Sequence, residues 1–211
     1  MKPAYFILMF LISAHAFAEE YEMNELPMYG GQHNPQVEPN KENSKSAAEL
    51  GWKYLYRGDL STAMKRFNQA WMFDRKNPDA FWGFGIIMGR RAAKEDTGEN
   101  LTESINLLTT AHELSPGNGR ITGDLAFSYT FLGRHLATQG KDGKKKYEKA
   151  EELFIDAYKH DPKYPPIAAN WAVLKFYVGD YQSAKKLISE AHGLGYEPDP
   201  DFLKELNEKV K

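Results

Sequence analysis

The sequence predicts an all-α fold made of repeated helix pairs, and three observations support this prediction. Four segments share one i, i+4, i+7 pattern, which places the three residues on a single face of an α-helix. Turn-forming stretches separate these segments, namely "YRGDLS", "KNPD", "SPGNG", "HDPKYPP" and "YVGDYQS". Small residues also recur at a step of 15 positions, from Ala70 to Gly85, Ala111 to Ala126 and Ala157 to Ala172. Repetition of this kind is typical of a solenoid.

The second helix of each expected pair follows the order small, large, small. Its four versions are Ala63-Phe67-Ala70, Ser104-Leu108-Ala111, Ala150-Phe154-Ala157 and Ala184-Ile188-Ala191. The first helix carries a large apolar residue and then a small one, in Leu50-Gly51, Phe84-Gly85, Leu125-Ala126 and Trp171-Ala172. Small side chains let two helices approach closely, and the large residue fills the space between them. We therefore expect four helix pairs that meet at small residues.

Together these residues resemble the tetratricopeptide repeat (TPR), a helix-turn-helix unit of 34 residues. Gly51 and Gly85 are 34 positions apart, and so are Ala150 and Ala184. The resemblance covers residues 44–197 and implies a right-handed α-solenoid of about four repeats, at about 44–77, 78–118, 119–164 and 165–197. The remaining residues, 198–211, contain "DPDFLKELNEKVK" and predict a capping helix that covers the last repeat.

The sequence departs from the TPR pattern at several positions. Ser104 stands where alanine is usual, and Lys175 stands where an aromatic residue is expected. Extra residues also separate the two helices of the second and third pairs, around "RRAAKEDTGEN" and "GRHLATQGKDGKKKY". Because the 15-residue step is preserved, we expect these insertions to extend helix ends or loops at one edge.

Residues 1–18 predict a secretory signal peptide. Lys2 precedes an apolar run from Ala4 to Ile12, and "Ala16-Phe17-Ala18" places small residues where a signal peptidase cuts, so cleavage is expected after Ala18. The run is shorter than the roughly 20 residues that a membrane-spanning helix needs. A retained anchor is the alternative. The mature chain is expected in a bacterial periplasm or secreted.

Residues 19–43 predict a flexible leader rich in glutamate, with Pro27, Pro35 and Pro39 discouraging a helix. Leu26, Pro27, Met28 and Tyr29 form an apolar tetrapeptide within it. Three interpretations stay open for this tetrapeptide. It belongs to a disordered leader, it docks on the repeats of its own chain, or it binds a partner directly.

Composition argues against several functions. The formal net charge of −2 and the pI of about 6.3 provide no broad basic surface for nucleic acid. The absence of cysteine excludes disulfides and thiolate metal sites. The sequence contains no HExxH, GxxxxGK[ST] or GxSxG motif. Histidines 112, 160 and 192 lie near expected helix C-termini, where they interact favourably with the helix dipole. We predict no catalytic residue, metal or cofactor, and hence no enzyme.

The run "KDGKKKYEK" contains Lys141, Lys144, Lys145, Lys146 and Lys149. A run of lysines is typical of solvated surface, although it would also suit an anionic partner. The sequence does not decide between these two interpretations.

The candidate binding residues come from the resemblance. In TPR arrays the first helices line a concave groove that binds peptides or partner helices. The corresponding positions here are Trp52, Tyr56, Trp82, Ile86, Arg90, Phe127, Phe131, Asn170, Val173 and Tyr177. Core packing between repeats is the alternative role for some of them, because the two faces of a first helix adjoin.

The sequence thus predicts a non-enzymatic, exported interaction scaffold that binds a peptide or protein in an aromatic groove. Since aromatic rings also stack on sugars, the alternative is an auxiliary module that binds a cell-wall enzyme or glycan. No nucleic-acid partner and no membrane-spanning segment are expected in the mature chain. The oligomeric state stays open.

Overall fold

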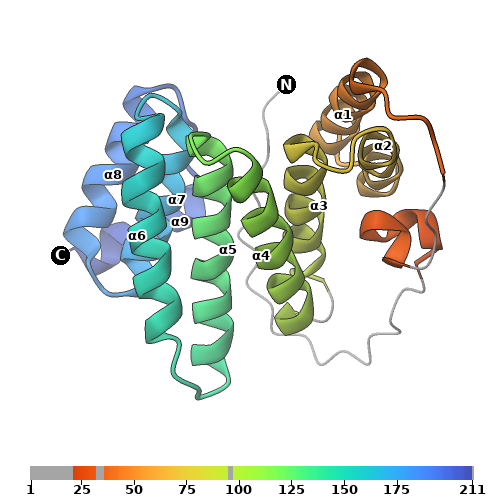
Figure 1. Ribbon diagram of the computed structural model, residues 1–211. Helices are drawn as coiled ribbons and strands as arrows, with labels where there is room; N and C mark the ends of the chain where they lie inside the picture. The colour runs from red at the N-terminus through yellow and green to blue at the C-terminus, as the bar shows by residue number, and fades with distance from the viewer. Residues whose placement is uncertain (1–20, 32–35, 95–96, 211) are drawn as a thin grey trace. The chain divides into compact units, whose positions relative to one another are not determined.

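The computed structural model describes residues 21–31, 36–94 and 97–210. The predicted signal peptide, residues 1–18, therefore lies outside the described part of the chain. The elements are η1 (Met23–Glu25), η2 (Pro27–Gly31), α1 (Lys41–Tyr56), α2 (Leu60–Phe73), α3 (Pro78–Arg91), α4 (Thr97–Leu114), α5 (Gly119–Thr138), α6 (Lys144–His160), α7 (Pro165–Tyr177), α8 (Tyr181–Gly193) and α9 (Pro200–Lys209). All of these are helical, which confirms the predicted fold class (Figure 1).

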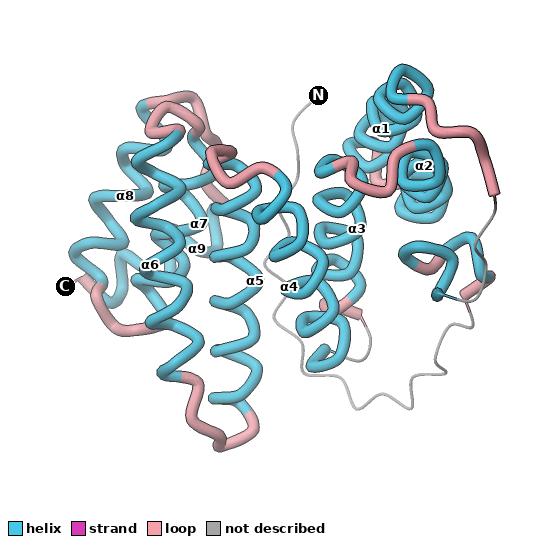
Figure 2. The backbone as a smooth tube through the Cα atoms, in the orientation of Figure 1, coloured by secondary structure: helices cyan, strands magenta, loops and turns pink. Residues whose placement is uncertain are grey.

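The chain divides into two compact units, which we describe separately. The described part of the N-terminal unit runs to Ser115 and holds η1, η2 and α1–α4, and the C-terminal unit starts at Pro116 and holds α5–α9. In the first unit α1 pairs with α2 and α3 with α4. In the second, α5 pairs with α6 and α7 with α8, and short loops join the partners (Figure 2).

Polar caps begin most of the helices where the turn residues lie. The side-chain oxygens of Asn40, Asp59, Asn77, Asn118, Asp180 and Asp199 accept hydrogen bonds from first-turn amides. Such caps satisfy backbone N–H groups that have no partner inside the helix. In "YRGD" and "YVGD", Gly58 (φ 83°) and Gly179 (φ 81°) adopt the left-handed conformation directly before the capping aspartate. Glycine adopts this conformation without steric cost.

The insertion of the third pair lengthens both of its helices, α5 and α6, in the C-terminal unit. Helix α5 has 20 residues and α6 has 17, whereas α7 and α8 have 13 each. Helix α1 also begins at Lys41, three residues before the predicted repeat boundary at 44, because Asn40 caps it through the amide of Asn43. The predicted leader therefore ends earlier than the sequence pattern indicated.

The core of the N-terminal unit centres on Phe67 of α2, which is fully buried. Its ring lies against the backbones of α1 and α3 at two glycines. A Cβ atom added to Gly51 would lie 2.7 Å from the ring, and one added to Gly83 would lie 2.3 Å from it. Real Cβ contacts are not that short, so the ring occupies space that only glycine leaves open. The large residue of the second helix thus fills the gap between two first helices.

The serine that replaces alanine in the second pair has a partner. Ser104 Oγ on α4 donates a hydrogen bond of 2.8 Å to the carbonyl oxygen of Gly85 on α3, and Ser104 is fully buried. A buried hydroxyl is tolerated when it is hydrogen-bonded. The departure from the pattern therefore adds a hydrogen bond between α3 and α4.

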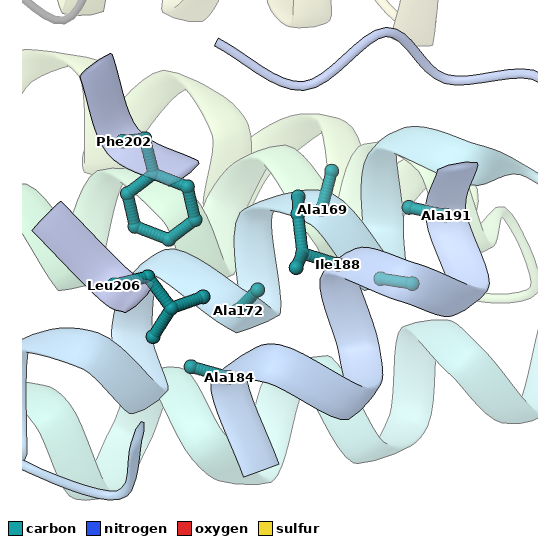
Figure 3. Close-up of a cluster of buried hydrophobic side chains, with 8 residues drawn as sticks. Ala169, Ala172, Ala184, Ile188, Ala191, Phe202 and Leu206 are labelled. Atoms are coloured by element: carbon teal, nitrogen blue, oxygen red, sulfur yellow. The ribbon is translucent and has the colours of Figure 1, made fainter. Parts of the chain in front are cut away.

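In the C-terminal unit, α9 covers the last helix pair as predicted. Phe202 and Leu206 are buried against small residues of α7 and α8, including Ala169, Ala172, Ala184 and Ala191, with Ile188 among them (Figure 3). Asp199 caps the start of α9. An amphipathic end helix of this kind keeps the last apolar face away from water.

Among the described residues, no helix combines the length and apolar character that crossing a membrane requires.

A buried polar chain ties α1, α2 and α3 together. Asn77 Nδ2 donates to Ser44 Oγ over 2.7 Å, and Ser44 Oγ donates to the carbonyl oxygen of Ala70 over 2.7 Å. The other side-chain atom of Asn77, Oδ1, accepts from the amides of Asp79 and Ala80 and caps α3. Every polar atom in this chain is satisfied, as a buried network requires.

We predict that Gly83→Ala destabilises the protein by about 1–3 kcal/mol, because the added methyl group would overlap the Phe67 ring. The measurement is urea denaturation followed by circular dichroism. The control is Gly193→Ala on α8, where an added Cβ meets nothing within 4 Å, so stability should stay equal or rise. Unchanged stability of Gly83→Ala would contradict the close packing.

We predict that Asn77→Ala costs about 2 kcal/mol of stability, because it removes a cap and leaves buried Ser44 Oγ without its donor. Asn118→Ala is the matched control, since Asn118 caps α5 through the same pair of amide bonds in a less buried setting. The control should cost about 1 kcal/mol. Equal losses in thermal denaturation would show that the bond to Ser44 contributes nothing.

Candidate functional site

The N-terminal unit carries a surface of aromatic side chains on its two first helices. The rings of Trp52 on α1 and Trp82 on α3 are 4.5 Å apart between centroids, at an interplanar angle of 64°. Tyr56, one turn after Trp52, stacks on it at 6.1 Å. Tyr56 is 70 % exposed, whereas the two tryptophans are half-buried. We call Trp52, Tyr56 and Trp82 the tryptophan surface.

Contacts with α2 and α3 hold the Trp52 ring in place. Its ring meets Phe67 edge to face at 5.2 Å, and its Nε1 donates to Asp79 Oδ1 over 3.3 Å. Trp52 therefore takes part in core packing on this side, the alternative role that the sequence left open, while its part in binding stays a prediction. Tyr56 extends outward from this base.

The other two predicted residues of this unit lie on α3. Ile86 is half-buried and Arg90 is exposed. Arg90 Nη1 donates a hydrogen bond of 3.1 Å to the carbonyl oxygen of Leu55 near the end of α1. A guanidinium at a helix C-terminus is favoured by the helix dipole. Arg90 thus holds the exposed end of α1, where Tyr56 lies, against α3.

A second aromatic cluster lies in the C-terminal unit. Phe127 and Phe131 of α5 meet edge to face at 4.7 Å, and Tyr177 of α7 lies 6.4 Å from Phe131. Arg134 donates from Nη1 to the Tyr177 hydroxyl and lies 4.7 Å from the centre of its ring. All four side chains are half-buried. The cluster thus joins α5 to α7 within this unit.

The remaining predicted residues have different surroundings. Val173 packs against the buried cluster of α7, α8 and α9, so it serves the core. Asn170 is half-buried on α7. The structure therefore brings together Trp52, Tyr56 and Trp82 in one unit, with Arg90 bonded to the same helix end, and three predicted residues of α5 and α7 in the other. The single groove that the sequence placed across both units stays a prediction.

The candidate docking segment contacts helix α2. Its two turns, η1 and η2, pack on α2 in the N-terminal unit (Figure 1). Pro27 is buried, Leu26 and Met28 are half-buried, and the ring of Tyr29 lies 6.5 Å from that of Trp71 on α2. Of the three interpretations of the tetrapeptide that the sequence left open, docking on the chain's own repeats matches this arrangement. The contact, however, is made by a second helix, whereas the predicted groove is lined by first helices.

Two residues that hold this segment, Asn68 and Arg91, were missed by sequence reasoning. Asn68 is fully buried and Arg91 is 4 % exposed. A signal was present for Asn68, because it lies four positions after buried Met64 on an otherwise apolar helix face. A polar residue at such a position needs a partner, but the sequence does not show which one.

Lys175, the second departure from the repeat pattern, belongs to an ion cluster. Its Nζ lies 2.7 Å from Glu151 Oε1 and 3.7 Å from Asp180 Oδ2. Glu151 Oε2 also accepts from Trp171 Nε1 over 2.9 Å. The lysine therefore ties α7 to α6 where an aromatic residue would otherwise pack.

An open cleft of about 580 Å³ lies beside this cluster in the C-terminal unit. Lys141 and Lys144 of the basic run line it together with Asp142, Glu148 and Glu151. Because both acidic and basic groups line the cleft, it offers no single charge to a ligand. On α6, Lys149 pairs with Glu152 at 3.0 Å, as is typical of a solvated helix face.

His160 and His192 have structural contacts. Nδ1 of His160 lies 3.6 Å from Asp156 Oδ1, and Nδ1 of His192 lies 3.1 Å from the carbonyl oxygen of Tyr196. Within the part of the chain that the structure describes, no three His, Asp or Glu side chains are arranged to hold a metal ion.

No protein-family model matches the sequence, and no curated protein matches it. Among solved structures, the chain is similar to a thermophilic TPR protein of Thermus thermophilus, with a TM-score of 0.62 and 19 % sequence identity. The likeness covers 72 % of this chain and 74 % of that one. At this identity the likeness shows the fold. The chain therefore has a TPR-like helical repeat fold, which confirms the resemblance seen in the sequence.

The Tyr177 hydroxyl makes a pH prediction possible. Burial raises the pKa of Tyr177 above its usual value, and the nearby Arg134 guanidinium opposes this shift. The folded chain therefore keeps the proton at a pH where the unfolded chain loses it, so stability falls as pH rises above about 10. Tyr177→Phe should lose less stability than the wild type between about pH 9 and about pH 11. Equal losses in urea denaturation would contradict this role.

Proposed function

We propose that the chain is a non-enzymatic scaffold that binds a protein or peptide partner on the tryptophan surface. The TPR-like fold supports the general role, since it suggests protein–protein interaction. The surface itself is supported by one observation. An exposed tyrosine is stacked on a tryptophan, which contacts a second tryptophan across two helices.

Such a surface suits binding because of its residue types. Trp, Tyr and Arg are enriched among the residues that contribute most to protein interfaces. Each buried Å² of apolar area contributes about 25 cal/mol, and micromolar affinity corresponds to about 8 kcal/mol. A few aromatic anchors are therefore enough for a specific complex.

The rings are also held in place before a partner arrives. Phe67 supports Trp52 from below, Asp79 accepts its N–H, and Arg90 holds the end of α1 to α3. Side chains that are already ordered lose little conformational entropy on binding. The unit thus presents a rigid aromatic face.

We further propose that the mature chain acts in the bacterial periplasm or after secretion, with an envelope protein or peptide as its partner. Residues 1–18 support export because they have the features of a cleaved signal peptide. The near-neutral charge argues against nucleic acid as a partner. The same ring faces would also stack on sugars, so a glycan of the cell wall is the alternative ligand.

A photoreactive amino acid at Tyr56 in the full chain, expressed in the native host, tests the proposal. Mass spectrometry should identify protein adducts at this position, because the side chain is exposed beside both tryptophans. The adducts should fall at least tenfold when Trp82→Ala is added, with helicity unchanged by circular dichroism. The control position is Ile155 on α6, which is 55 % exposed and lies outside this surface.

Identical adducts at positions 56 and 155 would contradict the proposal, as would adducts that survive Trp82→Ala. Retention of the protein on purified peptidoglycan without any protein adduct at position 56 would favour the glycan alternative. Loss of that retention in Tyr56→Ala would assign it to this surface.

A further inference from the structure

Three successive main-chain carbonyls of the leader are held by two buried side chains. Asn68 Nδ2 donates to the carbonyl oxygens of Asn24 and Leu26 over 3.0 and 2.9 Å. Between them, Arg91 Nη2 donates to the carbonyl oxygen of Glu25 over 2.9 Å. The amide of Tyr29 donates back to Asn68 Oδ1 over 3.4 Å. The asparagine thus uses both ends of its amide on one short peptide.

Side chains of the leader add contacts on both sides of these carbonyls. The Glu25 carboxylate accepts from Ser61 Oγ and lies 3.2 Å from Lys65 Nζ. Upstream, the Arg91 guanidinium lies 3.7 Å from the centre of the Tyr21 ring. Pro27 is buried downstream. The contacts therefore select for charge, for an aromatic ring and for an apolar residue at fixed spacing.

The leader adopts a backbone shape that few sequences tolerate. Met28, Tyr29, Gly30 and Gly31 have φ values of 51°, 56°, 63° and 71°. Consecutive left-handed residues are unfavourable unless contacts hold them, and glycine lowers the cost. The bond from the Tyr29 amide to Asn68 lies within this turn. The shape is thus matched to the surface that receives it.

From these contacts we infer that α2 and the end of α3 form a second peptide-binding site, distinct from the tryptophan surface. Its ligand is a short acidic peptide in which Glu-Leu-Pro precedes a left-handed turn, and residues 21–31 of the same chain occupy it. We call Ser61, Lys65, Asn68 and Arg91 the clamp site. A side-chain amide and a guanidinium group can recognise a peptide by donating hydrogen bonds to its main-chain carbonyls. Here the peptide belongs to the same chain.

Tethering explains why a small contact suffices. Gly31 is only ten positions from the start of α1 at Lys41, so the segment is at high effective concentration near α2. A free peptide of the same chemistry would bind only after the tethered segment leaves. The clamp site is therefore occupied by the chain's own segment, and reversing the charge of Glu25, which faces Lys65, should release that segment so that a free peptide can bind.

The first test measures backbone hydrogen exchange of residues 24–31 in the full chain. Asn68→Leu keeps the volume and removes the amide, so exchange in this segment should rise at least tenfold while that of α7 and α8 stays unchanged. Glu25→Lys should have the same effect because it faces Lys65. Adding Lys65→Glu to Glu25→Lys should restore protection. Glu38→Lys, at an exposed glutamate after the segment, is the matched control and should change nothing.

The second test adds a fluorescent synthetic peptide of residues 21–31. It should bind saturably to the Glu25→Lys chain, whose own segment has left the site, and bind at least tenfold more weakly to the wild type. The Glu25→Lys, Asn68→Leu chain should not bind it. Unchanged exchange in Asn68→Leu, or equal peptide binding with and without Asn68, would overturn the inference. Crosslinking at Tyr56 reports on the tryptophan surface, so the two proposals can fail separately.

Discussion

The ring of Phe67, enclosed by the backbones of two glycines, is the contact on which the N-terminal unit depends. Because Gly51 and Gly83 have no side chains, α1 and α3 can both lie against the same ring of α2. Trp52 rests on the edge of that ring and meets Trp82 on α3. The position of the exposed aromatic surface therefore follows from a packing constraint in the core. A larger residue at either glycine would separate the helices that carry the surface.

Buried polar groups also hold the N-terminal unit together, by hydrogen bonds between its helices and to the leader. Ser44 and Asn77 tie α1 to the end of α2 and the start of α3, and Asn68 with Arg91 fastens the leader. Each of these groups is costly to bury alone and stabilising when every bond is made. Helices that carry small residues leave room for such ties. At the end of the C-terminal unit the contacts are apolar instead, because alanines of α7 and α8 pack against Phe202 and Leu206 of α9.

Much of the architecture could be predicted because it repeats. The recurring small residues indicated the helix pairs, and the turn-forming stretches indicated where neighbouring helices are separated. Gly83 was not identified, since its role depends on the orientation of a ring 16 positions away rather than on the period. The partner of Asn68 lies 42–44 positions upstream, in a segment whose composition indicated disorder. Long-range pairings of single residues leave no periodic trace, so only the structure shows them.

We propose that a partner binds at the tryptophan surface rather than at the clamp site or the C-terminal unit. The chain has four tryptophans, and they report on these places separately. Trp52 and Trp82 form the surface, Trp71 lies beside Tyr29 of the leader, and Trp171 is hydrogen-bonded to Glu151. Fluorine NMR of 5-fluorotryptophan-labelled protein, recorded with and without extract of the bacterial envelope, therefore tests directly where the partner binds. We expect the signals of Trp52 and Trp82 to shift or broaden while those of Trp71 and Trp171 stay unchanged. A change confined to Trp71 or Trp171 would contradict it.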